Sequence, residues 1–235
     1  MKFIRQSVEI RSKEFTNEYV LELIEDAART CYKSEANKKP GSAERLVKNL
    51  ISRGHEAMLE HGPELSMRFI TDRGITHEIV RHRLFSFAQE STRYVKYGQA
   101  GEDTEFILPE EKGYITQPDK LLARSWHRIV ESDAETADYF ALPSIEQEVI
   151  AAFTGAEAHY RALLELGCQP QAARDVLPND VKTEIVVTGN IREWRHFFTL
   201  RCDKAAHPRM QLLANTALDL AYNRCPLVFA DIVNQ

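Results

Sequence analysis

The hydrophobic residues of the chain recur with two periods, which predict strands in some stretches and helices in others. Alternation of apolar and polar residues is typical of a strand with one buried face. It marks KFIRQSVEI (residues 2–10), ELSMRFITDRG (64–74, ending in a turn) and KTEIVVTG (182–189). A helical period with a polar opposite face marks residues 17–32, 42–54, 77–83, 118–138, 144–166, 190–202 and 207–225. This mixture predicts an α+β fold with one core.

The ends of these helices carry residues that favour starting or stopping a helix. The expected N-caps, whose side chains accept from the first turn, are Asn17, Ser42, Thr76 and Asn190. Glu193 is expected to close a capping box with Asn190, and Pro208 suits the first turn of the last helix. Gly54 and Gly167 are expected to stop the helices that precede them.

Residues 1–235 are expected to form a single domain, because no repeat, low-complexity tract or linker divides them. The length of 235 residues and the hydrophobic fraction of 43% suit one substantial core. Residues 98–113 are acidic and contain glycine, so we expect an exposed loop there. Residues 170–178 are bracketed by prolines and predict a short helical turn.

Charge, hydropathy and cysteine usage predict a cytoplasmic protein that binds neither nucleic acid nor membrane. The formal net charge of −5 does not favour general binding to duplex DNA. The N-terminal residues lack the apolar core of a signal peptide, and no apolar run approaches the roughly 20 residues of a spanning helix. The four cysteines form no CxxC pair, which is typical of reduced thiols.

Positive charge is concentrated in two segments of this acidic chain. Residues 68–97 contain six Lys/Arg and three Asp/Glu, and residues 190–209 contain five and two, so each carries +3. Within them, RHRLFSFAQESTRY (81–94) and NIREWRHFFTLR (190–201) interleave apolar residues with arginines, an arrangement that suits a solvated face poorly. Arginine binds phosphate and carboxylate groups with its planar fork. We therefore interpret the two segments as part of a site for a small anionic ligand.

The triplet Arg81, His82 and Arg83 is expected at a helix end. Successive residues of a helix lie about 100 degrees apart, so the three side chains point in different directions on a continuous helix. Where the chain turns, they can converge. Further polar residues are expected to follow in an irregular segment, namely Ser86, Gln89, Ser91 and Arg93.

Other common chemistries fit the sequence less well. HEAMLEH spaces His55 and His61 six residues apart, and HEIVRH spaces His77 and His82 five apart. Metal ligands on one helical face need a spacing of three or four, so no metal site is expected. The phosphate-binding patterns GxxxxGK[ST] and GxGxxG are absent from the sequence. Cys168 has no activating His or Arg within a turn, so a thiol nucleophile is not expected.

In its two arginine-rich segments the sequence resembles the flavin-dependent thymidylate synthases. The signature of that family is R-H-R, a serine three residues on, and then S-x-R-Y. It is matched at the family spacing by Arg81, His82, Arg83, Ser86, Ser91, Arg93 and Tyr94. Similarity to the family also covers SRGHEAMLEH, ARDVLP and NIREWRHFFTLR, and it is weakest at the N-terminus and in residues 98–113.

The resemblance implies which residues bind each small molecule. Implied FAD contacts are His55, Ala57, Arg81, His82, Arg83, Gln89, Asn190, Arg192 and His196. Implied dUMP contacts are Glu78, Ile79, Val80, Arg81, Gln89, Glu90, Ser91, Thr92, Arg93, Arg174 and Arg201. Arg201 matches the arginine that polarises the uracil ring, and it is the one catalytic residue implied. The alternative for Arg201 is a structural ion pair with Asp203 or Glu193.

Five positions depart from the commonest residues of the family. Ala88-Gln89 stands where many members have Asn-Glu, and Ala57 stands where a small hydroxyl residue often occurs. His196 replaces an asparagine of some members and can still donate a hydrogen bond. Glu78 replaces a common glutamine, so we expect it to face a ribose hydroxyl or backbone and not the phosphate.

The implied activity is conversion of dUMP to dTMP, with methylenetetrahydrofolate as carbon donor and FAD, reduced by NADPH, as hydride carrier. The resemblance also implies a twisted, largely antiparallel sheet flanked by helices, in a homotetramer with active sites between subunits. Phosphorylated ligands explain the clustered arginines, and hydride transfer from a flavin removes the need for a thiol. Two alternatives remain open: a nucleic-acid-binding module that uses the basic segments, and a flavoenzyme acting on another pyrimidine nucleotide.

Overall fold

The computed structural model describes residues 1–98, 102–110, 113–126 and 138–233, and the chain forms two compact units. Unit 1 comprises Met1–Gln6, Ile70–His77 and Gln89–Glu184. Unit 2 comprises Ser7–Phe69, Glu78–Ala88 and Ile185–Gln235. The expectation of one domain over residues 1–235 stays a prediction.

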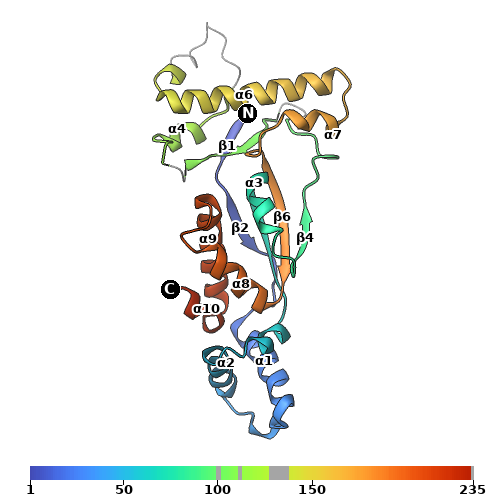
Figure 1. Cartoon of the computed structure of the whole chain (residues 1–235), viewed down its shortest axis with the longest axis vertical. Helices are drawn as coiled ribbons and strands as arrows, with labels where there is room; N and C mark the ends of the chain where they lie inside the picture. Colours follow the sequence, from blue (N-terminus) through green and yellow to red (C-terminus); the bar gives the residue numbers. More distant parts are fainter. Residues whose placement is uncertain (99–101, 111–112, 127–137, 234–235) are drawn as a thin grey trace. The chain divides into compact units, whose positions relative to one another are not determined.

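The strands form two sheets, and helices make up much of the remaining chain (Figure 1). The four-stranded antiparallel sheet has the order β2 (Ser7–Ile10), β3 (Leu65–Asp72), β6 (Lys182–Gly189) and β4 (Ser86–Gln89). A two-stranded parallel sheet pairs β1 (Lys2–Ile4) with β5 (Glu105–Ile107). The predicted α+β class with a largely antiparallel sheet is therefore confirmed.

Unit 1 is built around the longest helix, α6 (Ser144–Glu165). It also contains α4 (Pro118–Leu122), α7 (Pro170–Ala173) and the 3₁₀ turn η4 (Arg174–Val176). Aromatic and aliphatic side chains from these elements and from β1 and β5 form its core, and Phe106 stacks on Phe153 at 4.8 Å between ring centroids. Burial of such side chains supplies most of the driving force for folding of this unit.

Unit 2 contains α1 (Asn17–Tyr32), α2 (Ser42–Ser52), α8 (Ile191–Arg201), α9 (Pro208–Arg224) and α10 (Pro226–Val233). Short 3₁₀ turns, η1 (Glu35–Asn37) and η2 (Glu56–His61), follow α1 and α2. In Figure 1, α8, α9 and α10 lie side by side. Fully buried aromatic residues of α8 fill the core, and the Trp194 indole donates to the Leu65 carbonyl at 2.8 Å.

A glycine lets the segment before β4 enter this aromatic core. A Cβ atom on Gly189, the last residue of β6, would lie 2.3 Å from the Phe85 ring. Phe85 in turn packs against Trp194 with 4.5 Å between ring centroids. The small residue at the end of β6 therefore fixes where the segment carrying Phe85 lies.

The strand predicted over residues 2–10 is wrong in extent, because it divides into two strands that join different sheets. β1 pairs with β5, whereas β2 belongs to the four-stranded sheet. At the break, Arg5 donates to the Glu110 carboxylate at 3.0 Å, and Gln6 accepts from the Thr71 hydroxyl at 3.2 Å. The strands predicted at 64–74 and 182–189 are confirmed as β3 and β6, and Leu65, Met67 and Phe69 are fully buried.

Two of the predicted N-caps are wrong by one residue. The N-cap of α1 is Thr16, whose hydroxyl accepts from the Tyr19 amide, and Asn17 is the first helical residue. The N-cap of α2 is Gly41, and the Ser42 hydroxyl instead donates to the Glu25 carboxylate at 2.6 Å. The same hydroxyl oxygen accepts from the Lys39 amide at 3.1 Å, so the Ser42 hydroxyl bonds to the segment before α2 and to the neighbouring helix and not to the first turn of α2.

Most other helix-end predictions are confirmed, but the Glu193 carboxylate that was expected to close a capping box lies 3.6 Å from Nδ1 of His82. The Asn190 side chain accepts from the Glu193 amide at 2.9 Å and caps α8, and Pro208 begins α9. Gly54 and Gly167 follow α2 and α6 with positive φ angles of 70° and 91°. Residues 170–178 contain the predicted helical turn as α7 and η4. The sequence did not predict α10, which buries Val228, Phe229 and Ile232.

The helix predicted over 77–83, with a turn before it, begins and ends earlier. α3 spans Arg73–Ile79 and follows β3 directly, because the Asp72 carboxylate accepts from the Ile75 amide at 2.7 Å. Thr76 lies inside the helix and donates to the Arg73 carbonyl at 2.9 Å. The irregular segment expected after it is also partly wrong, since β4 includes Ser86 and Gln89.

Two predictions for the middle of the chain are wrong where the structure describes it. Within 98–113, expected to be an exposed loop, Thr104 and Phe106 to Leu108 are buried and β5 forms the parallel sheet. Within the helix expected over 118–138, only α4 is helical up to residue 126, and the Trp126 amide then donates to the Met1 carbonyl at 2.7 Å. Residues 99–101, 111–112 and 127–137 lie outside the described residues.

Candidate functional site

The R-H-R triplet lies where α3 has ended and the chain turns towards β4, as the sequence predicted. Arg81 and Arg83 are exposed, whereas His82 and Phe85 are buried. The His82 ring meets Phe197 of α8 edge-on, with 5.0 Å between centroids. Alternation of anchored aromatic rings with exposed arginines explains the mixed composition of this segment, because the rings hold the backbone while the guanidinium groups stay in solvent.

Arg201, at the end of α8, has its guanidinium held by two residues of unit 2. Its Nε donates to Nε2 of His82 at 3.0 Å, and its Nη1 donates to Oε2 of Glu78 at 2.9 Å. Its Nη2 donates to the main-chain oxygen of Glu78 at 3.0 Å. The sequence named Asp203 or Glu193 as the alternative ion-pair partner, but the carboxylate on Arg201 is that of Glu78.

The hydrogen bond from Arg201 fixes the tautomer of His82. Because Nε2 accepts, the ring proton belongs on Nδ1, which lies 3.6 Å from the Glu193 carboxylate. Burial, together with the positive charge of Arg201 and the nearby His196, lowers the pKa of His82 to about 4. Burial also raises the pKa of Glu193. His82 is therefore neutral at physiological pH and serves Arg201 as an acceptor.

The exposed side of α8 presents two more residues of the implied FAD site. Arg192 Nη1 donates to the Glu60 carboxylate at 2.6 Å, and His196 lies exposed beside the His82 ring, 5.7 Å between centroids. The Asn190 side chain is used as the helix cap. The ion pair with Glu60 ties Arg192 to η2, the turn that follows His55.

His55 and Ala57 line a groove of about 310 Å³ between α1, α2 and η2. Most of its other side chains are apolar, among them Leu46, Leu50 and Met58. The turn that carries Ala57 is fastened because buried Arg195 donates to Glu56 at 2.9 Å and to Asp231 of α10 at 2.7 Å. This groove offers an apolar wall with a histidine at its edge.

Unit 1 contains the implied dUMP residues from Gln89 to Arg93, together with Arg174. Arg174 Nη1 donates to the hydroxyl of buried Thr92 at 2.7 Å. Gln89 Nε2 donates to Thr76 at 3.0 Å, and Ser91 Oγ accepts from the Arg93 amide at 3.3 Å. Among the implied residues, Glu78, His82 and Arg201 belong to unit 2, whereas Gln89 to Arg93 and Arg174 belong to unit 1.

Lys182 is a neighbour of Glu90 that the sequence analysis did not identify. Its Nζ donates to Glu90 at 3.2 Å and to Glu184 at 2.7 Å. Burial acts to lower the pKa of Lys182, but the bonds to Glu184 and Glu90 outweigh it and raise the pKa. Lys182 lies on the predicted strand β6, 92 positions after Glu90, and no sequence motif indicated that the two residues pair.

Two further residues implied to contact dUMP follow Glu78. Ile79 is buried, and Val80 is 39% exposed.

The signature segment, residues 81–94, carries the family signature. Its three arginines, Arg81, Arg83 and Arg93, are exposed and form no ion pair within the described parts of the chain. Arg93 lies over the ring of exposed Tyr94, 5.5 Å from its centroid. Three cations within 13 residues, without carboxylate partners among the described residues, leave their N–H donors available for anions.

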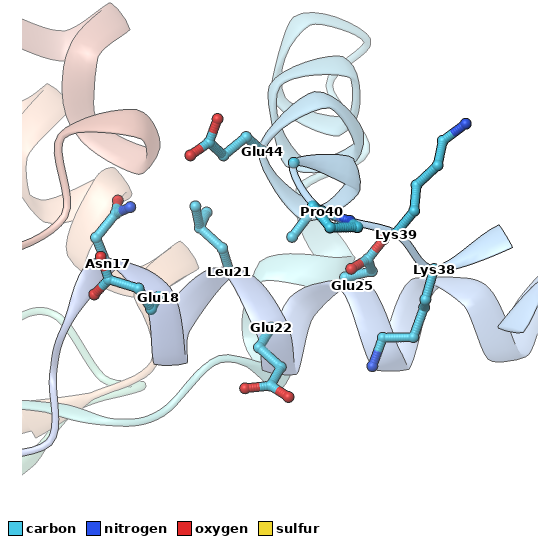
Figure 2. Close-up of a pocket in the computed structure, with 11 residues that line it drawn as sticks. Asn17, Glu18, Leu21, Glu22, Glu25, Lys38, Lys39, Pro40 and Glu44 are labelled. Carbon is cyan, nitrogen blue, oxygen red and sulfur yellow. The ribbon is translucent and has the colours of Figure 1, made fainter.

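A larger hollow, of about 490 Å³, does not suit an anionic ligand. Figure 2 shows Glu18, Glu22 and Glu25 on α1 and Glu44 on α2 around it, with Lys38 and Lys39 on the segment between the helices. Lys38 already pairs with Asp26. The carboxylates of this hollow would repel a phosphate, and none of the implied site residues lies in it.

No helix in the described part of the chain is both long and apolar enough to cross a membrane.

Comparisons with known proteins identify the family. Residues 16–227 match the family model described as thymidylate synthase complementing protein. A flavin-dependent thymidylate synthase from Corynebacterium aurimucosum is 35% identical over 212 residues, covering 89% of this chain and 78% of the relative. One from Mycobacterium leprae is 34% identical with the same coverage.

A solved structure shares the fold. The UMP/dUMP methylase PolB from Streptomyces cacaoi, bound with 5-Br dUMP, superposes with a TM-score of 0.72 at 22% identity, covering 100% of this chain and 97% of that one. The extent of the family match and the identity to the bacterial enzymes establish that this chain belongs to the thymidylate synthase complementing protein family, the flavin-dependent thymidylate synthases.

Proposed function

We propose that the protein catalyses the reductive methylation of dUMP to dTMP. Methylenetetrahydrofolate donates the carbon, and FAD, reduced by NADPH, carries the hydride. The observation that carries this proposal is the restraint of Arg201, whose guanidinium is oriented by Glu78 and His82 at the end of α8. Family membership supports the flavin and the substrate.

The residues of the implied flavin site fit a phosphorylated cofactor with an apolar ring. Exposed Arg81 and Arg83, without carboxylate partners in the described chain, suit a pyrophosphate. The apolar groove beside His55 and Ala57 suits a flat ring system. Arg192 and His196 on α8 add polar contacts. The chemistry that FAD supplies when bound is hydride transfer; the chain supplies binding and orientation.

For dUMP we assign phosphate binding chiefly to Arg93 and Arg174. Arg174 is preoriented by its bond to Thr92, so less side-chain entropy is lost when it binds an anion. Glu90 lies in the same segment, and Lys182 offsets its charge. This ion pair reduces the repulsion between Glu90 and a phosphate.

Arg201 is assigned to the uracil ring. A guanidinium has five N–H donors, and three of those on Arg201 bond to Glu78 and His82. The other two N–H groups can meet the ring carbonyl and imide, where negative charge develops when the accepting carbon reacts. Donors fixed in place before that charge appears lower the barrier without reorganisation.

The cysteines are not needed in this route. Burial raises the pKa of the Cys202 and Cys225 thiols to about 12, so neither is a thiolate at neutral pH. Cys31 is exposed and Cys168 is partly buried, and neither belongs to the residues gathered around Arg201 or Arg174.

We further propose a cytoplasmic homotetramer in which residues 1–235 act as one domain and neighbouring subunits share each active site. Leu84 and Tyr94 of the signature segment are 75% and 76% exposed in the single chain. Large apolar side chains beside a ligand site are typical of surfaces that a partner subunit covers.

The flavin assignment is tested by titrating purified protein with FAD and recording absorbance near ~450 nm, where oxidised flavin absorbs. We expect saturable binding, and dTMP formation when dUMP, methylenetetrahydrofolate and NADPH are added. Binding to polynucleotides that weakens steeply with salt, without FAD binding, would instead support a nucleic-acid-binding module.

A further inference from the structure

Glu78 holds Arg201 through both its side chain and its main chain. The carboxylate accepts from Nη1 and the carbonyl accepts from Nη2, at 2.9 and 3.0 Å. The two side chains are 28% and 18% exposed, so the pair is only partly screened by solvent. Without the carboxylate, Arg201 would keep its bonds to His82 and to the Glu78 carbonyl, but its Nη1 group would lose its acceptor and be free to rotate.

We propose that Glu78 is a positioning residue that orients the Arg201 guanidinium for the pyrimidine ring and does not itself bind dUMP; this rests on the function proposed for Arg201. The carboxylate was expected to face a ribose hydroxyl or backbone, but in the structure it accepts from Nη1 of Arg201. Together with His82 on Nε, it leaves Arg201 a single orientation.

The charge of Glu78 has a second consequence. A carboxylate beside Arg201 cancels its positive charge and also repels the phosphate of a nucleotide. A glutamine at the same place keeps an oxygen that accepts from Nη1 but removes the repulsion. Glu78→Gln is therefore expected to keep Arg201 oriented and, with one negative charge removed from the proposed dUMP site, to bind dUMP about threefold more tightly.

The test compares Glu78→Ala, Glu78→Gln and a matched control, Glu110→Gln. Glu110 pairs with Arg5 at 3.0 Å and its side chain is 27% exposed, so this control removes a similar ion pair and the same charge. The ¹⁵N resonance of the Arg201 Nη1 group, which bonds to the Glu78 carboxylate, reports in the ligand-free protein whether that group is held in place. Calorimetry gives dUMP affinity, and single-turnover oxidation of reduced FAD with saturating substrates gives the rate.

We expect Glu78→Ala to broaden or lose the Arg201 Nη1–H resonance and to slow single turnover about 10- to 100-fold, the usual effect of losing a hydrogen bond to a charged group. Glu78→Gln should keep the resonance, lose less rate and bind dUMP more tightly. Glu110→Gln should match the unmodified protein in all three measurements.

If Glu78→Ala keeps the Arg201 resonance and the single-turnover rate, while Arg201→Ala turns over slowly, the role of Glu78 is overturned and that of Arg201 stands. An Arg201→Ala variant with unchanged turnover would instead contradict the function proposed for Arg201, and the resonance alone would then decide whether Glu78 orients it. If Glu78→Ala does not fold, Glu78→Gln decides. Weaker dUMP binding by this variant would show that the carboxylate contacts the nucleotide and would contradict the proposal, whereas a retained Arg201 resonance with undiminished dUMP binding supports it.

Discussion

The Nε of Arg201 donates to Nε2 of His82 at 3.0 Å, and this bond joins the end of α8 to the turn that follows α3. It can form only while His82 is neutral, because a protonated ring has no acceptor nitrogen. The His82 ring is buried against Phe197, with 5.0 Å between the ring centroids, and this burial keeps the ring neutral and in place. The apolar environment of His82 thus preserves its hydrogen bond to Arg201, the residue that we assign to the uracil ring.

Stability should therefore fall in mildly acidic solution through His82. Histidine in the unfolded chain takes up a proton near pH 6.5, whereas His82 in the folded protein does so only near pH 4. Between these values the unfolded state binds more protons, so the contribution is fully present above pH 6.5 and is lost as the pH falls to 4. Its size is at most about 3 kcal/mol.

Urea unfolding at pH 7, 5.5 and 4.5 checks this contribution. The free energy of unfolding of His82→Asn should depend less on pH than that of the unmodified protein. His159→Gln, which removes an exposed histidine of α6, serves as control and should keep the original slope. Equal slopes for the unmodified protein and His82→Asn would contradict the account.

Thr92→Val should weaken dUMP binding without touching the phosphate. The variant keeps the shape of the side chain but removes the oxygen that accepts from Arg174 Nη1 at 2.7 Å. A bond of this kind contributes about 1.5 to 3 kcal/mol, so we expect the dUMP dissociation constant to rise about tenfold or more. Thr92→Ser should bind dUMP nearly normally. Calorimetric titration decides, and equal affinity of the valine and serine variants would exclude this role for Thr92.

Much of the fold follows from local patterns, and the failures have identifiable causes. The alternation of buried and less buried residues in β6 and the Asn190 cap of α8 both involve residues close in sequence, so the sequence predicted both. The partner of Arg201 is Glu78, 123 positions away, and no local pattern encodes that contact. The family signature identified both residues but gave no indication that they touch, because resemblance assigns positions to ligands and not to one another.

Gly189→Ala should destabilise the protein, since its Cβ would lie 2.3 Å from the Phe85 ring. Overpacking of a core typically costs about 1–3 kcal/mol. Phe85→Leu should relieve part of the clash, so the double variant should be more stable than the sum of the single effects predicts. Thermal or urea unfolding of the four proteins measures the coupling, and strict additivity would argue against this close approach.

Replacing each cysteine by alanine should leave substantial turnover with dUMP. Cys202 and Cys225 have thiol pKa values raised to about 12 by burial, so they are expected to affect packing and not chemistry. Steady-state rates of the four variants, corrected for folded protein and bound FAD, provide the comparison. Complete loss of turnover in Cys168→Ala, with fold and FAD retained, would require a nucleophilic thiol.

The central claim is that Arg201 polarises the uracil ring. Single-turnover oxidation of reduced FAD in Arg201→Ala, with dUMP and methylenetetrahydrofolate saturating, tests it most directly. Removing one donor aimed at developing charge typically costs about 3 kcal/mol, so we expect FAD binding to persist and flavin oxidation to slow about 100- to 1,000-fold. Arg201→Lys should recover little, because a point charge does not replace the planar fork. Formation of dTMP by Arg201→Ala at the unmodified rate would contradict the account.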